Sequence, residues 1–155
     1  MKQLTYLAII LGLFFLLSKR TYAQEPDQIS LARLIFSEAA NESSLGKAAV
    51  GWVVRNRVES ERFPNTYPGV IFQPWQFSEV NSALWKKTYQ VKNRSFFENA
   101  IWQDCLEIAD KVIKGTITDP TSGADHYYNP RLASPYWAKK MTVTRTIGNH
   151  LFLKS

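Results

Sequence analysis

Glu38 is a carboxylate at a position where its helix is expected to be apolar. Leu31, Leu34 and Ile35 recur at helical spacings, and Glu38 is the next position on the same stripe. A carboxyl group on a core-facing stripe loses water, and this loss raises its pKa. A carboxylic acid that stays protonated near neutral pH can serve as a general acid. The alternative is a partly exposed Glu at a helix end that pairs with a nearby Arg.

Cleavage of a glycosidic bond is one reaction that needs such an acid. It also needs a group that manages the oxocarbenium-like carbon, either a second carboxylate or a neighbouring group of the substrate itself. Glu42, Glu79 and Asp125 are the candidates for a second carboxylate, and none is compelling. Glu42 follows Glu38 by one helical turn, so both would approach a sugar from the same side. The sequence therefore favours a mechanism with one carboxylate.

The elements that must position Glu38 are mostly helices. A capping box at Ser95 and Glu98 begins one of them, and the Pro and Gly residues within 61–78 predict a long loop. The expected elements are helices over 28–40, from Ser43 or Ser44 to about 60, and over 95–114, a short strand at 70–72, and a β-hairpin from 142–147 and 150–153. The fold class is therefore α+β, a helix-dominated domain with a small β-hairpin and long loops lining a cleft.

The chain begins with the features of an export signal. Lys2 precedes an almost wholly apolar run over 4–17, and Thr21-Tyr22-Ala23 offers small residues at the two positions that a signal peptidase reads. We therefore expect a signal peptide over 1–23 and one catalytic domain over 24–155. The apolar run is short for a membrane span of about 20 residues. An uncleaved anchor that touches the membrane through residues 4–17 is the alternative, and in both cases the folded part lies outside the cytoplasm.

The net charge and the cysteine content exclude several classes of protein function. Without its signal region the net charge falls from +6 to +3, which suits an anionic polymer but is too weak to indicate nucleic acid. The single cysteine excludes an internal disulfide, and Cys105 lies on a helical stripe of core hydrophobes. The spacing of His126 and His150 fits no known zinc pattern. We therefore expect no cofactor and no metal.

Several blocks of the sequence carry a family resemblance. They include the Glu-Ala-x-x-Glu motif at 38–42 and the run Gln-Pro-Trp-Gln-Phe-Ser at 73–78. The blocks lie, in order, at 31–42, 46–58, 62–66, 69–78, 124–130, 135–138 and 147–152. Together they resemble the catalytic domain of the spore cortex-lytic enzymes, a family of cell wall hydrolases, over nearly all of residues 29–152.

The resemblance implies a lysozyme-like domain that cleaves peptidoglycan in the manner of a lytic transglycosylase. In that reaction the hydroxyl on carbon six of N-acetylmuramic acid attacks its own anomeric carbon, and the β-1,4 bond to N-acetylglucosamine breaks without water. The family's catalytic Glu falls on Glu38. The family usually has Arg-Gly where this chain has Ala40-Asn41, and this departure leaves the role of Glu42 open. The family also occurs in phage and in bacteria that form no spores.

The expected substrate-binding residues would form two walls of a cleft. Gln76 and Ser78 could hydrogen-bond acetamido or hydroxyl groups, and the hydroxyl of Tyr127 or Tyr128 could stabilise developing charge. The full expected set is Glu42, Gln76, Phe77, Ser78, Tyr127, Tyr128, Asn129 and Trp137. The alternatives for these residues are plain packing and the capping of a helix that starts near Ser78.

Three other interpretations stay open. A muramidase or an N-acetylglucosaminidase would use water, and its products would lack an anhydro end. A non-catalytic cell-wall-binding module would use the aromatic loops alone, but it would gain nothing from a desolvated acid. A zinc amidase would lose activity in a chelator. The expected partner is peptidoglycan, without nucleic acid, and the expected state is a monomer.

Overall fold

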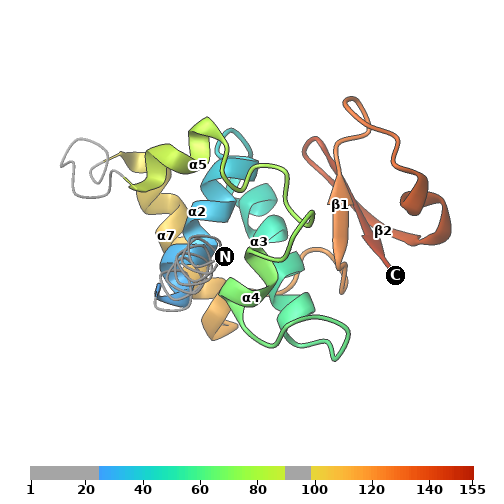
Figure 1. Ribbon diagram of the computed structural model, residues 1–155, viewed down its shortest axis with the longest axis horizontal. Coiled ribbons are helices and arrows are strands. Elements are labelled where there is room, and N and C mark those ends of the chain that lie inside the picture. Colours follow the sequence, from blue (N-terminus) through green and yellow to red (C-terminus); the bar gives the residue numbers. More distant parts are fainter. Residues whose placement is uncertain (1–24, 90–98) are drawn as a thin grey trace, which may run out of the picture.

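The computed structural model describes residues 25–89 and 99–155. Helices gather in one lobe, and a small antiparallel sheet stands beside them as a second lobe that holds the C-terminus (Figure 1). The predicted fold class, α+β with helices dominant, is confirmed. The expected signal segment over 1–23 and the membrane contact through 4–17 lie outside the described residues. No helix within the described part of the chain is long and apolar enough to cross a membrane.

Three helices build the core of the helical lobe: α2 (Asp27–Ala39), α3 (Ser44–Val58) and α7 (Ala100–Lys114). The helix α3 passes close to both of the others at Gly51. A Cβ there would lie 3.2 Å from Ile35 of α2 and 3.2 Å from Val112 of α7. Cys105 is fully buried in this core, as predicted. Because Gly51 has no side chain, α2 and α7 can both pack closely against α3, and this packing fixes the position of α2.

The helix ends follow local sequence signals. Ser43 caps α3, because its hydroxyl oxygen accepts a hydrogen bond from the backbone N–H of Gly46. Asn99 caps α7 in the same way, so this helix begins at Ala100 rather than at the predicted 95. The predicted capping box at 95–98 lies outside the described residues. Gly115, with a φ of 67°, ends α7 where the sequence predicted the stop.

The strand predicted at 70–72 is wrong, because this segment belongs to the short helix α4 (Tyr67–Ile71). The hydroxyl of Thr66 accepts from the N–H of Gly69, and Pro68 stands in the first turn, where its missing N–H is not needed. These local signals outweigh the β-branched residues that follow. The next helix, α5 (Ala83–Lys87), is capped by Ser82. Ser78 therefore caps no helix, and the capping alternative for it is wrong.

The sheet contains the predicted hairpin and one strand more. The hairpin consists of β2 (Thr142–Ile147) and β3 (His150–Lys154), joined by a turn in which Gly148 has a φ of 56°. The added strand, β1 (His126–Tyr128), pairs with the other edge of β3, and the strand order is β1-β3-β2. A 3-10 helix, η2 (Tyr136–Lys140), lies between β1 and β2. Phe152 of β3 is fully buried and packs the sheet against Val53 of α3.

Candidate active site

A cleft of about 510 Å³ opens between the two lobes. Its walls come from the end of α2, the loop between α4 and α5, β1 with the segment after it, and the β2–β3 turn. The polar or charged lining residues are Ser37, Glu38, Asn41, Glu42, Arg57, Gln76, Ser78, Glu79, Tyr127, Tyr128, Asn129, Asn149 and His150. Such a mixture of polar and aromatic groups in a concave space is typical of a site that binds a polar organic ligand.

Glu38 lies in the last turn of α2 and projects into this cleft. Its Oε1 accepts a hydrogen bond of 3.3 Å from the backbone N–H of Glu79. Burial raises the pKa of Glu38 from the ordinary value of 4.5 to about 7, because the charged form loses water there. The Glu79 N–H and the Tyr127 hydroxyl lower this pKa, and the nearby charge of Glu79 raises it, but burial dominates. The carboxyl is therefore poised to release and take up a proton at neutral pH.

Tyr127 faces Glu38 from β1. Its hydroxyl oxygen is buried, and burial together with the Glu38 carboxylate raises the pKa of the phenol well above 10. Among the described residues no group meets the distance and angle limits for a hydrogen bond with this hydroxyl. The hydroxyl nevertheless lies close enough to the Glu38 carboxyl to lower its pKa. Its ring packs against His150, at 5.3 Å between centroids, and against Phe152, at 5.7 Å. These rings hold a neutral phenol beside the acid, as one expected wall of the cleft.

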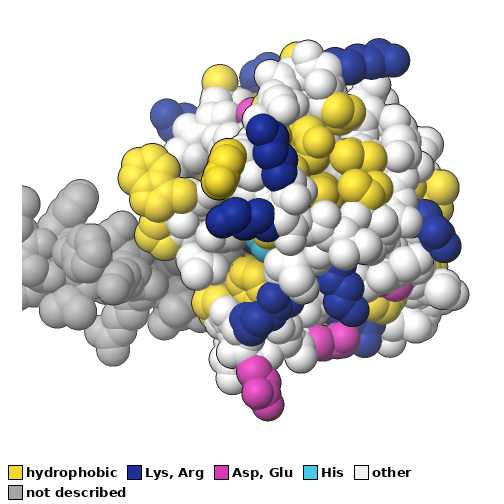
Figure 2. Space-filling view, turned by 90° about the vertical axis from the view of Figure 1, so that its right-hand side faces the viewer, with side chains coloured by type: hydrophobic (Ala, Val, Ile, Leu, Met, Phe, Trp, Pro, Cys, Tyr) yellow, Lys and Arg dark blue, Asp and Glu magenta, His cyan; other side chains and the backbone are white. Residues whose placement is uncertain are grey.

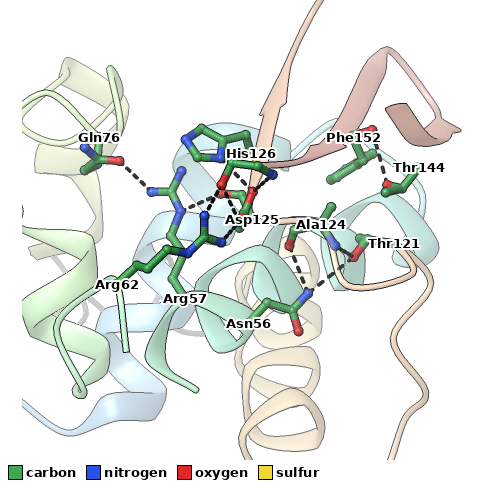
Figure 3. A network of polar contacts seen from close by, with 11 residues as sticks. Asn56, Arg57, Arg62, Gln76, Thr121, Ala124, Asp125, His126, Thr144 and Phe152 are labelled. Carbon is green, nitrogen blue, oxygen red and sulfur yellow. Dashed lines mark hydrogen bonds and ion pairs between the residues drawn. The ribbon is translucent and has the colours of Figure 1, made fainter. Parts of the chain in front are cut away.

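Arg57 is a lining residue that sequence reasoning missed. Its side chain is buried, and its guanidinium lies over the rings of Phe63 and Phe77 at 5.1 and 5.0 Å. Its Nη1 donates to Oε1 of Gln76 at 2.9 Å, and its Nε donates to the backbone carbonyl of Asp125 at 2.6 Å (Figure 3). Arg57 thereby ties the α4–α5 loop to the start of β1. Its position on a buried stripe of α3, after Val50 and Val54, was the available signal.

Asp125 does not line the cleft, so it is no second carboxylate for Glu38. Its carboxylate accepts from Arg62 at 2.6 Å and pairs with Nδ1 of His126 at 2.8 Å (Figure 3). It also accepts from the N–H of Ser155 at 3.0 Å. Burial alone would raise the pKa of Asp125, but the hydrogen bonds with His126 and Ser155 keep this pKa below its ordinary value. Asp125 therefore anchors the C-terminal end of the chain to β1.

Glu42 lines the cleft, but its carboxylate is engaged by the β2–β3 turn. Oε1 accepts from Nδ2 of Asn149 at 2.8 Å and lies 3.8 Å from Nδ1 of His150. A Cβ at Gly148 would overlap this carboxylate. Glu42 therefore joins the helical lobe to the sheet lobe at one end of the cleft. It is held on the turn and does not stand opposite Glu38.

The other expected residues fall on both sides of Glu38. Gln76, Phe77 and Ser78 line one wall, and Tyr128 and Asn129 line the opposite wall with Tyr127. Trp137 is not among the lining residues. Its ring lies edge-on to the ring of Tyr128, at 5.8 Å between centroids. Seven of the eight expected substrate-binding residues thus line the cleft, and Trp137 does not; their binding roles stay predictions.

The remaining nucleophile and metal candidates lie elsewhere. Burial raises the pKa of the Cys105 thiol to about 12, and Cys105 sits in the helical core away from the cleft. His126 and His150 belong to two separate clusters, with Asp125 and with Glu42. Across residues 25–89 and 99–155, no group of three or more His, Cys, Asp or Glu side chains is placed to hold a metal ion.

A helical domain that holds a carboxylic acid with a pKa near 7 in an open cleft has the properties of an acid–base catalyst. Sequence comparison supplies the family. Residues 41–153 match the model of the family described as Cell Wall Hydrolase, and this chain belongs to that family. Glu38 lies just before the matched range, so membership alone says nothing about its role.

Individual relatives agree with this assignment. The chain is 34% identical over 135 residues to a spore cortex-lytic enzyme of Bacillus cereus, covering 86% of this chain and 46% of that protein. It is 30% identical to the spore cortex-lytic enzyme of Oceanobacillus iheyensis, covering 86% of this chain and 43% of that protein. The chain thus spans less than half the length of these two relatives.

Two solved structures share the fold. One is the catalytic domain of the germination-specific lytic transglycosylase SleB from Bacillus anthracis, with a TM-score of 0.67 and 32% identity, covering 84% of this chain and 96% of that one. The other is the catalytic domain of the Bacillus cereus SleB protein, with a TM-score of 0.66 and 33% identity, covering 83% and 90%. The described fold is therefore that of a SleB catalytic domain.

Proposed function

We propose that this protein cleaves the glycan strands of peptidoglycan as a lytic transglycosylase, with Glu38 as its catalytic acid and then its base. The observation that carries the proposal is the raised pKa of Glu38, about 7, in a cleft large enough for sugar rings. The family and the SleB structures support the substrate class. A non-catalytic wall-binding module would have no use for this acid.

The reaction follows from the two protonation states of Glu38. The protonated carboxyl gives its proton to the glycosidic oxygen, and the bond from that oxygen to the anomeric carbon of N-acetylmuramic acid breaks. The carboxylate then takes the proton of the hydroxyl on carbon six, whose oxygen bonds to the anomeric carbon. Glu38 is protonated again, and no water is consumed. The Glu79 N–H and the Tyr127 hydroxyl stabilise the intermediate carboxylate, because both lower its pKa.

Arg57 and Gln76 position the sugar in this proposal. Arg57 occupies Oε1 of Gln76, and the amide nitrogen of Gln76 points away from the guanidinium (Figure 3). That nitrogen is a donor suited to the carbonyl of an acetamido group. Ser78 on the same wall and Asn129 on the opposite wall offer further hydrogen-bonding groups. Tyr128 presents an aromatic ring, and Trp137 packs edge-on against that ring.

Products of digestion in heavy-oxygen water test the reaction type. Purified sacculi are digested, and the muropeptides are analysed by mass spectrometry. The proposal predicts anhydro ends without label. Label at the muramic acid terminus would mean that water attacks, and label at N-acetylglucosamine ends would mean an N-acetylglucosaminidase. An amidase would release peptides instead of shortening the glycan.

A water-using hydrolase is the second candidate, and the position of Glu79 favours it. Glu79 lines the cleft beside Glu38, and its charge acts on that carboxyl. A carboxylate there could activate a water if the sugar leaves room for one. Glu79→Gln separates the two candidates, because its backbone N–H still donates to Glu38. Loss of turnover by about 100-fold or more would favour the hydrolase, and near-normal turnover favours the transglycosylase.

We further propose that the protein acts outside the cytoplasm as a monomer. The apolar run over 4–17 and the small residues before Gln24 support export, as does a substrate that lies outside the membrane. Sequencing the N-terminus of the protein recovered from cells tests cleavage after Ala23. A start at Met1 in the membrane fraction would instead establish the anchor.

A further inference from the structure

The sheet lobe carries positive charge without any negative charge in its sequence. Residues 126–155 contain five basic side chains and no Asp or Glu, whereas residues 24–125 contain 11 basic and 13 acidic ones. The five are Arg131, Lys139, Lys140, Arg145 and Lys154. None of them forms an ion pair with a carboxylate of the described residues. The modest net charge of the whole chain therefore hides a strong asymmetry between the lobes.

All five cations are exposed, and exposed hydrophobic side chains lie near them along the chain, among them Leu132, Tyr136 and Val143. Figure 2 views the molecule from the sheet side, and Lys and Arg side chains are spread there among hydrophobic ones, with acidic side chains mostly toward the lower edge. Tyr136 is 73% exposed, and the ammonium groups of Lys139 and Lys140 lie 5.8 and 5.5 Å from its ring centre. Each ammonium is within cation–π range while still open to solvent. We call Arg131, Tyr136, Lys139, Lys140 and Arg145 the basic surface.

The part of the basic surface within 131–140 continues the wall of the cleft. Leu132 and Ala133, which follow Arg131, line the cleft, and Trp137 of η2 packs its ring against the cleft residue Tyr128. A glycan strand in the cleft would therefore carry its substituents past this surface. In peptidoglycan these substituents are the peptide stems on muramic acid, and the stems carry free carboxylates. Their charge is complementary to the surface, and their attachment to the strand places them there.

We propose that the basic surface binds the carboxylates of peptide stems carried by the same glycan strand that occupies the cleft. Exposed charge pairs are individually weak, but stems repeat along a strand, so several contacts act together. The inference rests on the proposed function, because that function places a glycan strand in the cleft. Anionic phosphodiester polymers of the wall offer the other source of negative charge, and the experiment distinguishes them from stems.

Binding is measured by co-sedimentation in a Glu38→Gln background, so that the polymer is not digested. The test variant carries Arg131→Gln, Lys139→Gln, Lys140→Gln and Arg145→Gln together. The matched control carries Lys86→Gln, Lys87→Gln, Lys111→Gln and Lys114→Gln, which remove the same charge from the helical lobe. Three polymers, each immobilised on beads so that all of them sediment, are compared: intact sacculi, sacculi freed of phosphodiester polymers, and glycan freed of stems by an amidase, which keeps only the lactyl carboxylate of each muramic acid.

The test variant should bind intact sacculi about tenfold more weakly, while the control binds like the parent. The parent should lose the same factor when the stems are removed or when salt is raised, since exposed charges are screened. Equal binding by test and control variants would overturn the inference. Loss of parent binding on removal of the phosphodiester polymers, rather than the stems, would also overturn it. Circular dichroism checks folding, and Lys139→Gln with Lys140→Gln serves as the smaller variant if the fourfold one unfolds.

Activity separates this inference from the proposed function. With Glu38 intact, the test variant should cleave stem-free glycan as fast as the parent and intact sacculi more slowly. If the parent cleaves neither polymer, the proposed function fails, whereas stem-dependent binding would still support the basic surface. If both polymers are cleaved equally by parent and test variant, the surface takes no part in substrate recognition.

Discussion

Glu38→Gln should abolish cleavage and stabilise the fold at the same time. The pKa of Glu38 rises from 4.5 to about 7 in the folded protein, and one pKa unit corresponds to about 1.4 kcal/mol. The ionised carboxylate therefore destabilises the folded state by up to about 3 kcal/mol. Solvent that reaches the cleft screens part of this destabilisation. We therefore expect the free energy of unfolding of Glu38→Gln to exceed that of the parent by about 1–3 kcal/mol. Gln keeps the shape and still accepts from the Glu79 N–H.

The extra stability of Glu38→Gln over the parent grows as pH rises. The folded protein holds the Glu38 proton up to about pH 7, whereas the unfolded chain loses it near pH 4.5. Folding therefore takes up a proton between these values, and the free energy of unfolding falls as pH rises through that window. Below pH 4.5 Glu38 is neutral in both states and resembles Gln. The stability difference should be near zero at pH 4 and complete at pH 8.

Urea unfolding at pH 4 and pH 8 measures this difference. The control is Glu61→Gln, which alters an exposed glutamate outside the cleft and should show no comparable change. A Glu38→Gln variant that is no more stable at pH 8 than the parent would mean that Glu38 titrates normally. The argument from desolvation would then fail.

The same variant tests the role of Glu38 in catalysis. A general acid contributes roughly 100- to 10,000-fold in rate, and Gln has no proton to give. Turbidity clearance of purified sacculi should fall by that factor while co-sedimentation with sacculi persists. Activity within a few-fold of the parent would remove Glu38 from the mechanism.

Other predictions concern the surroundings of Glu38. Tyr127→Phe removes a hydroxyl that lowers the pKa of Glu38, so the alkaline limb of kcat/KM against pH should move to higher pH; an unchanged or lower limb would contradict this. Gly148→Ala should lower stability by about 1–3 kcal/mol, because φ is 56° there and the new Cβ would overlap Glu42; an unchanged melting temperature would refute the contact. Sacculus clearance should persist in EDTA, and a loss restored by zinc would revive the amidase interpretation.

The sequence alone determined the helical scaffold and the acid on it. The apolar stripe through Leu31, Leu34 and Ile35 predicted both α2 and the desolvation of Glu38, because helical periodicity sets which side chains face the core. The sequence also predicted a cap at Ser43 or Ser44, the stop at Gly115 and a hairpin from 142–147 and 150–153. Each depends on residues close together in the chain, so each is a local decision.

Tertiary structure alone decided what surrounds the acid. Glu79 reaches Glu38 from 41 residues away, and Asn149 reaches Glu42 from 107 residues away. The strand β1 exists because β3 offers it an edge, and no local pattern marked it. Asp125, a candidate second carboxylate by sequence, lies outside the cleft, where Arg62 and Ser155 engage its carboxylate. Side-chain spacing along one helix predicts burial, but the identity of the group across a cleft depends on how distant segments pack.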